Sequence, residues 1–168
     1  MLETGSRIEA LMRAHKRERG SVKLAEEYLE AVYEILQRRS GRVRPVDVAK
    51  ALNVAPSTVK KVITRLCEKG YLRYQPYKVL ELTEEGLARV KELKHRHDTV
   101  SRLFQALGLD ELSAEVEAER MEHSLSETST AVLEALLNTL ESDEEVLRRV
   151  RSGVFEGLVS GGFLRKKD

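Results

Sequence analysis

The chain has 168 residues, of which 41% are apolar and 34% are charged, and its formal net charge is +1. This length suits one ordinary domain or two small ones with a hydrophobic core, and the composition is typical of a helix-rich globular protein. The single cysteine, Cys67, excludes an internal disulfide and a cysteine-rich zinc module. The sequence contains neither a membrane-spanning apolar run nor the apolar stretch of a signal peptide, so we expect a cytoplasmic protein that does not enter a membrane.

Charge is distributed unevenly along the chain. Residues 38–82 contain eleven Lys or Arg against three acids, whereas residues 98–150 contain thirteen acids against four arginines. A solvated surface of mixed charge would not usually sort its signs by segment. The asymmetry therefore predicts one part that meets a polyanion and another part with a different task.

The first half of the chain predicts three helices after a basic N-terminal extension, residues 1–22, to which we assign no role. The first helix covers 24–38, where apolar residues recur with a period of 3.6. A short amphipathic helix follows within 44–54. The third covers 56–69, since Pro56 suits a first helical position and Gly70 suits the position after the C-cap. The residues expected to face inward from the short helix are Val46, Val48, Ala49 and Leu52.

Residues 71–82 predict a β-hairpin around a turn at 75–78. Helix, tight turn, helix and hairpin, in this order, are typical of a winged helix-turn-helix domain, here bounded at 23–83.

The exposed face of the third helix carries hydroxyls and amines that can reach base edges and phosphates in a major groove. The start of the second helix and the tip of the hairpin would meet the DNA backbone. A winged helix used for protein contacts is the alternative, and the positive charge of the segment disfavours it. The predicted DNA-binding residues are Arg44, Ser57, Thr58, Lys60, Lys61, Thr64, Arg65, Tyr77 and Lys78.

A helical domain over 84–168 completes a mainly α fold. Thr83 is the predicted cap of a long linking helix at about 84–107, whose apolar stripe includes His97. Further helices are expected at 110–123, after Ser124, and from 143 to about 151. Ser124 and Glu127 have the spacing of a capping box, so Ser124 is the predicted N-cap of the helix that follows it.

The stretch AERMEHSLS, residues 118–126, contains candidate metal ligands. Glu119, Glu122 and His123 stand at i, i+3 and i+4, so they share one helical face. Taken alone, this face fits a solvated charged surface as well as a metal site. His97 alone would usually be a buried, hydrogen-bonded core histidine.

Glu27 and Glu30 on the first predicted helix belong to the same question. Taken alone, they fit the solvated side of that helix. All the candidate ligands, however, lie beside apolar stripes that must pack on other helices. Carboxylates held near such interfaces need a cation to offset repulsion and desolvation, and this favours a metal site.

The run of residues 24–126 resembles the diphtheria-toxin-repressor family of metal-dependent transcriptional regulators, especially its manganese-responsive branch. The resemblance covers the winged helix at 43–82, the pair Arg96-His97, the GLD turn at 108–110 and the motif E-x-x-E-H-x-L-S at 119–126. It implies a metal site to which the first helix supplies two ligands. The implied ligands are Glu27, Glu30, His97, Glu119, Glu122 and His123.

Two positions bear on the choice of metal. The iron-responsive branch has Met at the position of Glu27 and Cys at the position of Glu119. Carboxylates in place of both sulfurs make the site harder, which favours Mn²⁺, with Fe²⁺ or another divalent transition metal as the alternative. The familiar manganese-type residue at the first position is Asp, so Glu27 adds one methylene.

The second site of the iron branch is incomplete in this chain. Ser101 and Glu115 stand where that branch has Glu and His. The chain also lacks the length for the SH3-like third domain of that branch, which points to the two-domain type.

The resemblance implies a metal-activated repressor, not an enzyme, that binds a palindromic double-stranded DNA operator as a homodimer. Helices within about 98–151 would form the dimer, and the metal would link the two domains so that both recognition helices fit the operator. One alternative is a winged-helix transcription factor that metal does not control. Another is a di-metal carboxylate enzyme, disfavoured because that class needs paired Glu-x-x-His motifs. The apolar residues expected at the dimer face include Leu133, Leu136, Leu137 and Leu140.

Overall fold

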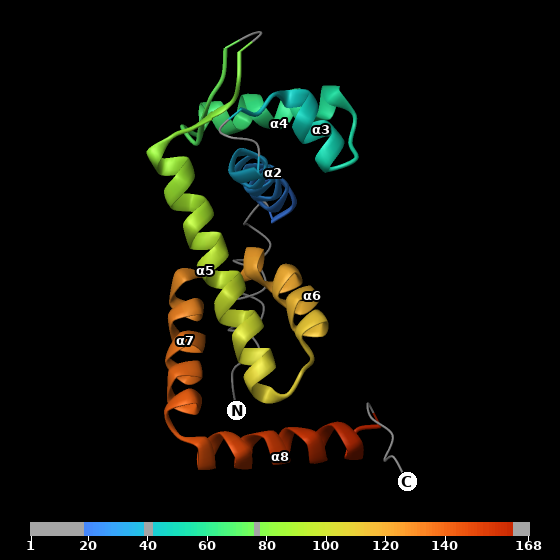
Figure 1. Ribbon diagram of the computed structural model, residues 1–168, viewed down its shortest axis with the longest axis vertical. Coiled ribbons are helices and arrows are strands. Elements are labelled where there is room, and N and C mark those ends of the chain that lie inside the picture. The colour runs from blue at the N-terminus through green and yellow to red at the C-terminus, as the bar shows by residue number, and fades with distance from the viewer. Residues whose placement is uncertain (1–18, 39–41, 76–77, 163–168) are drawn as a thin grey trace, which may run out of the picture. The chain divides into compact units, whose positions relative to one another are not determined.

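The computed structural model describes residues 19–38, 42–75 and 78–162, and it divides into two compact units. The units are Met1–Lys91 and Glu92–Asp168. Their boundary falls inside the long helix α5 (Glu84–Leu107), which contributes residues to both units (Figure 1).

Among its described residues, the first unit contains three helices before its strands: α2 (Arg19–Arg38), α3 (Pro45–Ala51) and α4 (Pro56–Glu68). Helix α2 begins five residues before the predicted start. Pro56 occupies the first turn of α4 as predicted, since its missing N–H has no helical partner there. Gly70 follows the C-cap of α4 with φ of +78°, a conformation that glycine adopts without a steric penalty.

The core of this unit forms where the apolar faces of the three helices meet. Val46 was predicted to face inward, and this is wrong, because 42% of its surface is exposed. The inner face of the short helix α3 is occupied instead by the three residues that follow Val46. The buried side chains of this core include Tyr28, Leu29, Val32, Val48, Val59, Val62, Ile63 and Leu66.

The predicted hairpin forms with short strands. Strands β1 (Leu72–Arg73) and β2 (Glu81–Leu82) are antiparallel, with Leu72 opposite Leu82 and Arg73 opposite Glu81. Val43 pairs with Leu80 in an isolated bridge that the sequence analysis did not predict, and its carbonyl accepts from the Leu80 amide at 2.7 Å. The bridge joins the chain before α3 to the base of the wing (Figure 1).

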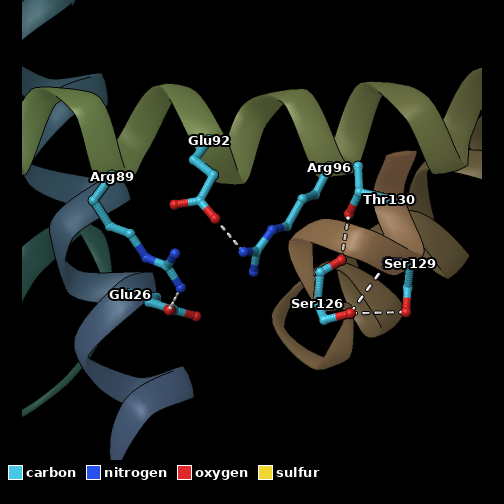
Figure 2. A network of polar contacts seen from close by, with 7 residues as sticks. All are labelled: Glu26, Arg89, Glu92, Arg96, Ser126, Ser129 and Thr130. Carbon is cyan, nitrogen blue, oxygen red and sulfur yellow. Dashed lines mark hydrogen bonds and ion pairs between the residues drawn. The ribbon is translucent and has the colours of Figure 1, made fainter. Parts of the chain in front are cut away.

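Thr83 caps α5, as predicted. Its Oγ1 accepts from the Gly86 amide at 2.9 Å and donates to the Gly70 carbonyl at 2.6 Å. The hydroxyl therefore starts α5 and ties this start to the end of α4. Further along α5, Arg89 forms an ion pair with the buried carboxylate of Glu26 on α2 (Figure 2).

The second unit contains the remainder of α5, followed by α6 (Glu111–Met121), the 3₁₀ turn η1 (Glu122–Ser124), α7 (Glu127–Ser142) and α8 (Glu144–Ser160). Gly108 takes φ of +109° directly after α5, and the Asp110 carboxylate caps α6 by accepting from the Ser113 amide. Helix α8 extends nine residues beyond the predicted end near residue 151.

The start of α7 differs from the prediction. Ser124 does not cap this helix, because it is the last residue of η1. Helix α6 tightens into this 3₁₀ turn, and the extended residue Leu125 must follow before a new helix can begin. The cap is Ser126, whose Oγ accepts from the Ser129 amide at 3.1 Å (Figure 2).

Two residues predicted at a dimer face lie instead in the core of their own unit. Leu137 and Leu140 are 1% and 3% exposed and form one cluster with Leu103. On the same helix Val132 and Leu136 are 64% and 47% exposed. In the part of the chain that the structure describes, no helix combines the length and the apolar character needed to cross a membrane.

Candidate metal centre

Three of the predicted ligands come together in the second unit. His97 projects from α5, Glu119 from the last turn of α6, and Glu122 from the start of η1. One ligand atom from each of the three lies within 4.8 Å of the other two. After the turn at Gly108, α6 returns beside α5, and this brings residues more than twenty positions apart into one group (Figure 1).

The ring of His97 lies between two carboxylates. Its Nδ1 is 2.9 Å from Glu122 Oε2, and its Nε2 is 2.9 Å from Glu115 Oε2. Partial burial lowers the pKa of His97, but the hydrogen bonds and charges of Glu115 and Glu122 together outweigh this effect and raise the pKa. The pKa of Glu115 is lowered, first by the hydrogen bond from Ser101 and then by that from His97.

Glu122 is the most buried carboxylate of the group, with 1% of its surface exposed. Burial raises its pKa, the negative charge of Glu119 raises it further, and His123 and His97 lower it in part. His123 Nε2 lies 3.2 Å from Glu122 Oε1. A buried carboxylate beside a second one costs free energy, and a bound cation would offset this cost.

The donor set fits a hard or borderline divalent metal. It comprises two carboxylates and one imidazole, with the imidazole of His123 in contact with one carboxylate. Carboxylate and imidazole ligands without thiolate suit Mn²⁺ or Fe²⁺ better than soft, sulfur-seeking ions. The residues present therefore fit the kind of metal that the sequence predicts.

Glu27 and Glu30 lie on α2, in the first unit. Glu27 Oε1 is 3.7 Å from Lys23 Nζ in a partly exposed i,i+4 ion pair, and Glu30 is half-buried. Their participation in the metal site stays a prediction from the family resemblance.

Glu115 and Ser101 are the residues that the sequence analysis left without a role. Both positions were described only as departures from a second metal site, whereas Glu115 contacts the His97 ring and Ser101 donates to Glu115. Glu115 precedes Glu119 by four residues and Glu122 by seven, so helical spacing alone could have placed Glu115 on the same face.

The first unit presents the predicted DNA-binding side chains to solvent. Thr64 Oγ1 also donates to the Lys60 carbonyl at 3.0 Å, so part of its hydrogen-bonding capacity is used within α4. Tyr77 lies outside the described residues. The exposed residues of the predicted set are Arg44, Ser57, Thr58, Lys60, Lys61, Thr64, Arg65 and Lys78.

Two family models match the chain. Residues 21–80 match the N-terminal DNA-binding domain of iron-dependent repressors, and residues 83–149 match their metal-binding and dimerisation domain. The HTH-type transcriptional regulator MntR of Bacillus subtilis is 32% identical over 127 residues, which cover 76% of this chain and 89% of that protein. An uncharacterised HTH-type transcriptional regulator of Methanocaldococcus jannaschii is 37% identical over 103 residues, 61% of this chain and 82% of that protein.

Solved structures of metal-dependent regulators are also similar to this chain. The metal-dependent transcriptional regulator MtsR is 26% identical, with a TM-score of 0.61 over 68% of this chain and 53% of that chain. The repressor ScaR with bound Zn²⁺ is 26% identical, with a TM-score of 0.60 over the same shares of the two chains. This chain spans about half the length of these two solved regulators. The sequence match and the order of the two matched domains agree, and the chain belongs to the iron-dependent repressor family, the diphtheria-toxin-repressor family of metal-dependent transcriptional regulators.

Proposed function

We propose that this protein is a Mn²⁺-activated repressor that acts in the cytoplasm, binds a palindromic DNA operator as a homodimer, and catalyses no reaction. The observation that carries the proposal is the cluster of His97, Glu119 and Glu122 in the same chain as a winged helix with an exposed basic face. The opposite charges of the two segments support different chemical tasks for the two parts.

Helix α4 supplies the recognition surface. Its buried face, which includes Val59 and Leu66, anchors the helix in the core. Its opposite face carries Lys61 and Arg65 one turn apart in solvent, where they can neutralise phosphates or reach base edges. Binding through such contacts weakens as salt rises, because released counterions contribute much of the affinity.

Coupling between metal and DNA binding would operate through α2. This helix packs into the winged-helix core through Tyr28, Leu29 and Val32, so its position governs that of α4. Glu27 and Glu30 on α2 would share one cation with His97, Glu119, Glu122 and His123. A bound cation supplies the positive charge that lets these carboxylates occupy one site.

The protein then holds the cation more tightly in the arrangement that brings both sets of ligands together. By linkage, that arrangement becomes more populated when the cation is present. With the cation removed, repulsion between the carboxylates disfavours the same arrangement.

The test is the affinity of the full chain for its own promoter DNA, measured at fixed ionic strength with Mn²⁺ and with a chelator. We expect Mn²⁺ to tighten binding by about fivefold to 150-fold, the usual range of allosteric coupling. Glu122→Ala should remove this response, whereas Glu117→Ala, which removes a carboxylate paired with Arg120, should keep it. Equal affinity of the unaltered chain under both conditions contradicts metal activation.

The same measurement separates the proposal from a winged-helix regulator without metal control. Such a regulator would bind the promoter with the same affinity before and after Glu122→Ala, whatever the metal concentration. A fall in affinity with added salt, seen in both cases, identifies phosphate contacts and does not depend on the metal.

A further inference from the structure

His97 has carboxylates at both ring nitrogens, and they lie on opposite edges of the ring. Glu122 is at Nδ1 and Glu115 is at Nε2, each at 2.9 Å. The lone pairs of the two imidazole nitrogens diverge, so a cation on one nitrogen cannot share the carboxylate that contacts the other. Because Glu119 groups with Glu122, the Nδ1 edge faces the metal cluster and the Nε2 edge faces away from it.

Glu115 is itself held in place from α5. Ser101 Oγ donates to Glu115 Oε1 at 2.5 Å, and Gln105 Nε2 donates to Ser101 Oγ at 3.0 Å. His97, Ser101 and Gln105 follow one another at intervals of one helical turn, and Ser101 is only 3% exposed. A buried donor on a rigid helix therefore fixes one oxygen of Glu115, and the other oxygen is left to accept from the His97 ring.

We infer that Glu115, supported by Ser101, is a positioning residue that fixes the ring orientation and tautomer of His97, so that Nδ1 presents its lone pair to the metal cluster. An acceptor at Nε2 keeps the ring proton there, and this leaves Nδ1 as the ligand atom. The inference rests on the proposed function. Removing a carboxylate that accepts a hydrogen bond from a metal-binding histidine typically weakens metal binding by about tenfold to a hundredfold.

The experiment compares full-length Glu115→Ala, Glu115→Gln and Ser101→Ala with the unaltered chain. Mn²⁺ affinity is measured by calorimetry, the ligand set by cadmium NMR of the Cd²⁺-loaded chain, and the His97 tautomer by nitrogen NMR of the metal-free chain. Glu117→Ala is the matched control, because Glu117 lies on the same helix but its carboxylate pairs with Arg120.

We expect Glu115→Ala to weaken Mn²⁺ binding by about tenfold to a hundredfold. Its cadmium resonance should stay in place, and in the metal-free chain the ring proton of neutral His97 should shift toward Nδ1, where Glu122 is then the remaining carboxylate acceptor. Glu115→Gln should recover most of the affinity, because the amide oxygen can accept the same proton. The Mn²⁺ affinity of Ser101→Ala should lie between those of Glu115→Ala and Glu115→Gln. The Mn²⁺ affinity of Glu117→Ala should equal that of the unaltered chain.

Three results would overturn the inference. An unchanged affinity in Glu115→Ala would show that His97 needs no support from Glu115. A shifted cadmium resonance, with no recovery in Glu115→Gln, would make Glu115 a ligand and not a positioning residue. An unchanged tautomer of His97 would remove the mechanism. Failure of the unaltered chain to bind Mn²⁺ would instead contradict the proposed function, and the nitrogen spectrum would still report whether Glu115 holds the ring.

Discussion

At the scale of single residues, the second unit depends on short polar side chains at its helix starts. Asp110 caps α6 with one oxygen 3.0 Å from the Ser113 amide and the other 2.7 Å from the Ser113 hydroxyl. These hydrogen bonds hold the pKa of Asp110 below its usual value of 3.8. Since α6 carries Glu115 and Glu119, this cap also fixes the start of the helix that supplies them.

The lowered pKa of Asp110 predicts a pH-dependent contribution to stability. A carboxyl group whose pKa is lower in the folded than in the unfolded chain stabilises the fold. This stabilisation is complete above the pKa of the unfolded chain and is lost as the pH falls through the pKa of the folded chain. Asp110→Ala should therefore melt at a lower temperature than the unaltered chain at neutral pH. The difference between the two melting temperatures should narrow below about pH 3.8. Thermal unfolding followed by circular dichroism measures both curves.

Asp110→Asn is the control for this prediction, because asparagine caps a helix about as well as aspartate and does not titrate. The melting temperature of Asp110→Asn should stay close to that of the unaltered chain at neutral pH, and it should fall less on acidification. A gap between Asp110→Ala and the unaltered chain that remains constant from neutral pH to pH 3 would contradict the prediction.

At the scale of elements, the join between α6 and α7 shows how a local pattern can mislead. The spacing of Ser124 and Glu127 matches a capping box, and so does the chemistry of both residues. The 3₁₀ turn at the end of α6 moves the cap by two residues, to Ser126. The pattern depends on where the preceding helix ends, which neither residue determines.

Paired serine substitutions test this assignment. Ser126→Ala should destabilise the folded chain by about 1 kcal/mol, because it removes the acceptor for the Ser129 amide. Ser124→Ala should change stability by less than about 0.5 kcal/mol, as expected for an exposed position without such a role. Denaturant unfolding of the two variants gives both values, and the opposite order would restore Ser124 as the cap.

At the scale of the whole molecule, the matched family domain is one of metal binding and dimerisation, and α7 offers an unpaired apolar strip. Val132 and Leu136 are one helical turn apart and exposed, while the neighbouring Leu137 is buried in the core. A self-complementary contact through such a strip would place two recognition helices at a set separation, as a palindromic operator requires.

We therefore predict different outcomes for two neighbouring leucines. Leu136→Glu should shift the chain from dimer to monomer in sedimentation equilibrium with little change in its circular dichroism. Leu137→Ala should instead lower the free energy of unfolding by about 2–5 kcal/mol, because it leaves a cavity in the core. A Leu136→Glu chain that remains dimeric would place the dimer contact elsewhere.

Periodicity and cap chemistry alone predicted most of the helices, the wing and the order of the winged helix-turn-helix, because these features depend on neighbours within one or two turns. The residue types at 97, 119, 122 and 123, together with the family resemblance, likewise predicted a hard metal site. Spacing along one helix placed Glu119, Glu122 and His123 on a shared face, but the proposed ligand set as a whole came from the resemblance to a known family.

Tertiary structure decided which of these groups meet. Only the return of α6 beside α5 puts Glu115 and Glu122 on opposite edges of the His97 ring. Only packing against Leu103 shows that Leu137 is a core residue, while Leu136 beside it stays in solvent. Contacts between segments depend on how helices pack and where their ends tighten, and a pattern read along one helix contains no information about the partner on another.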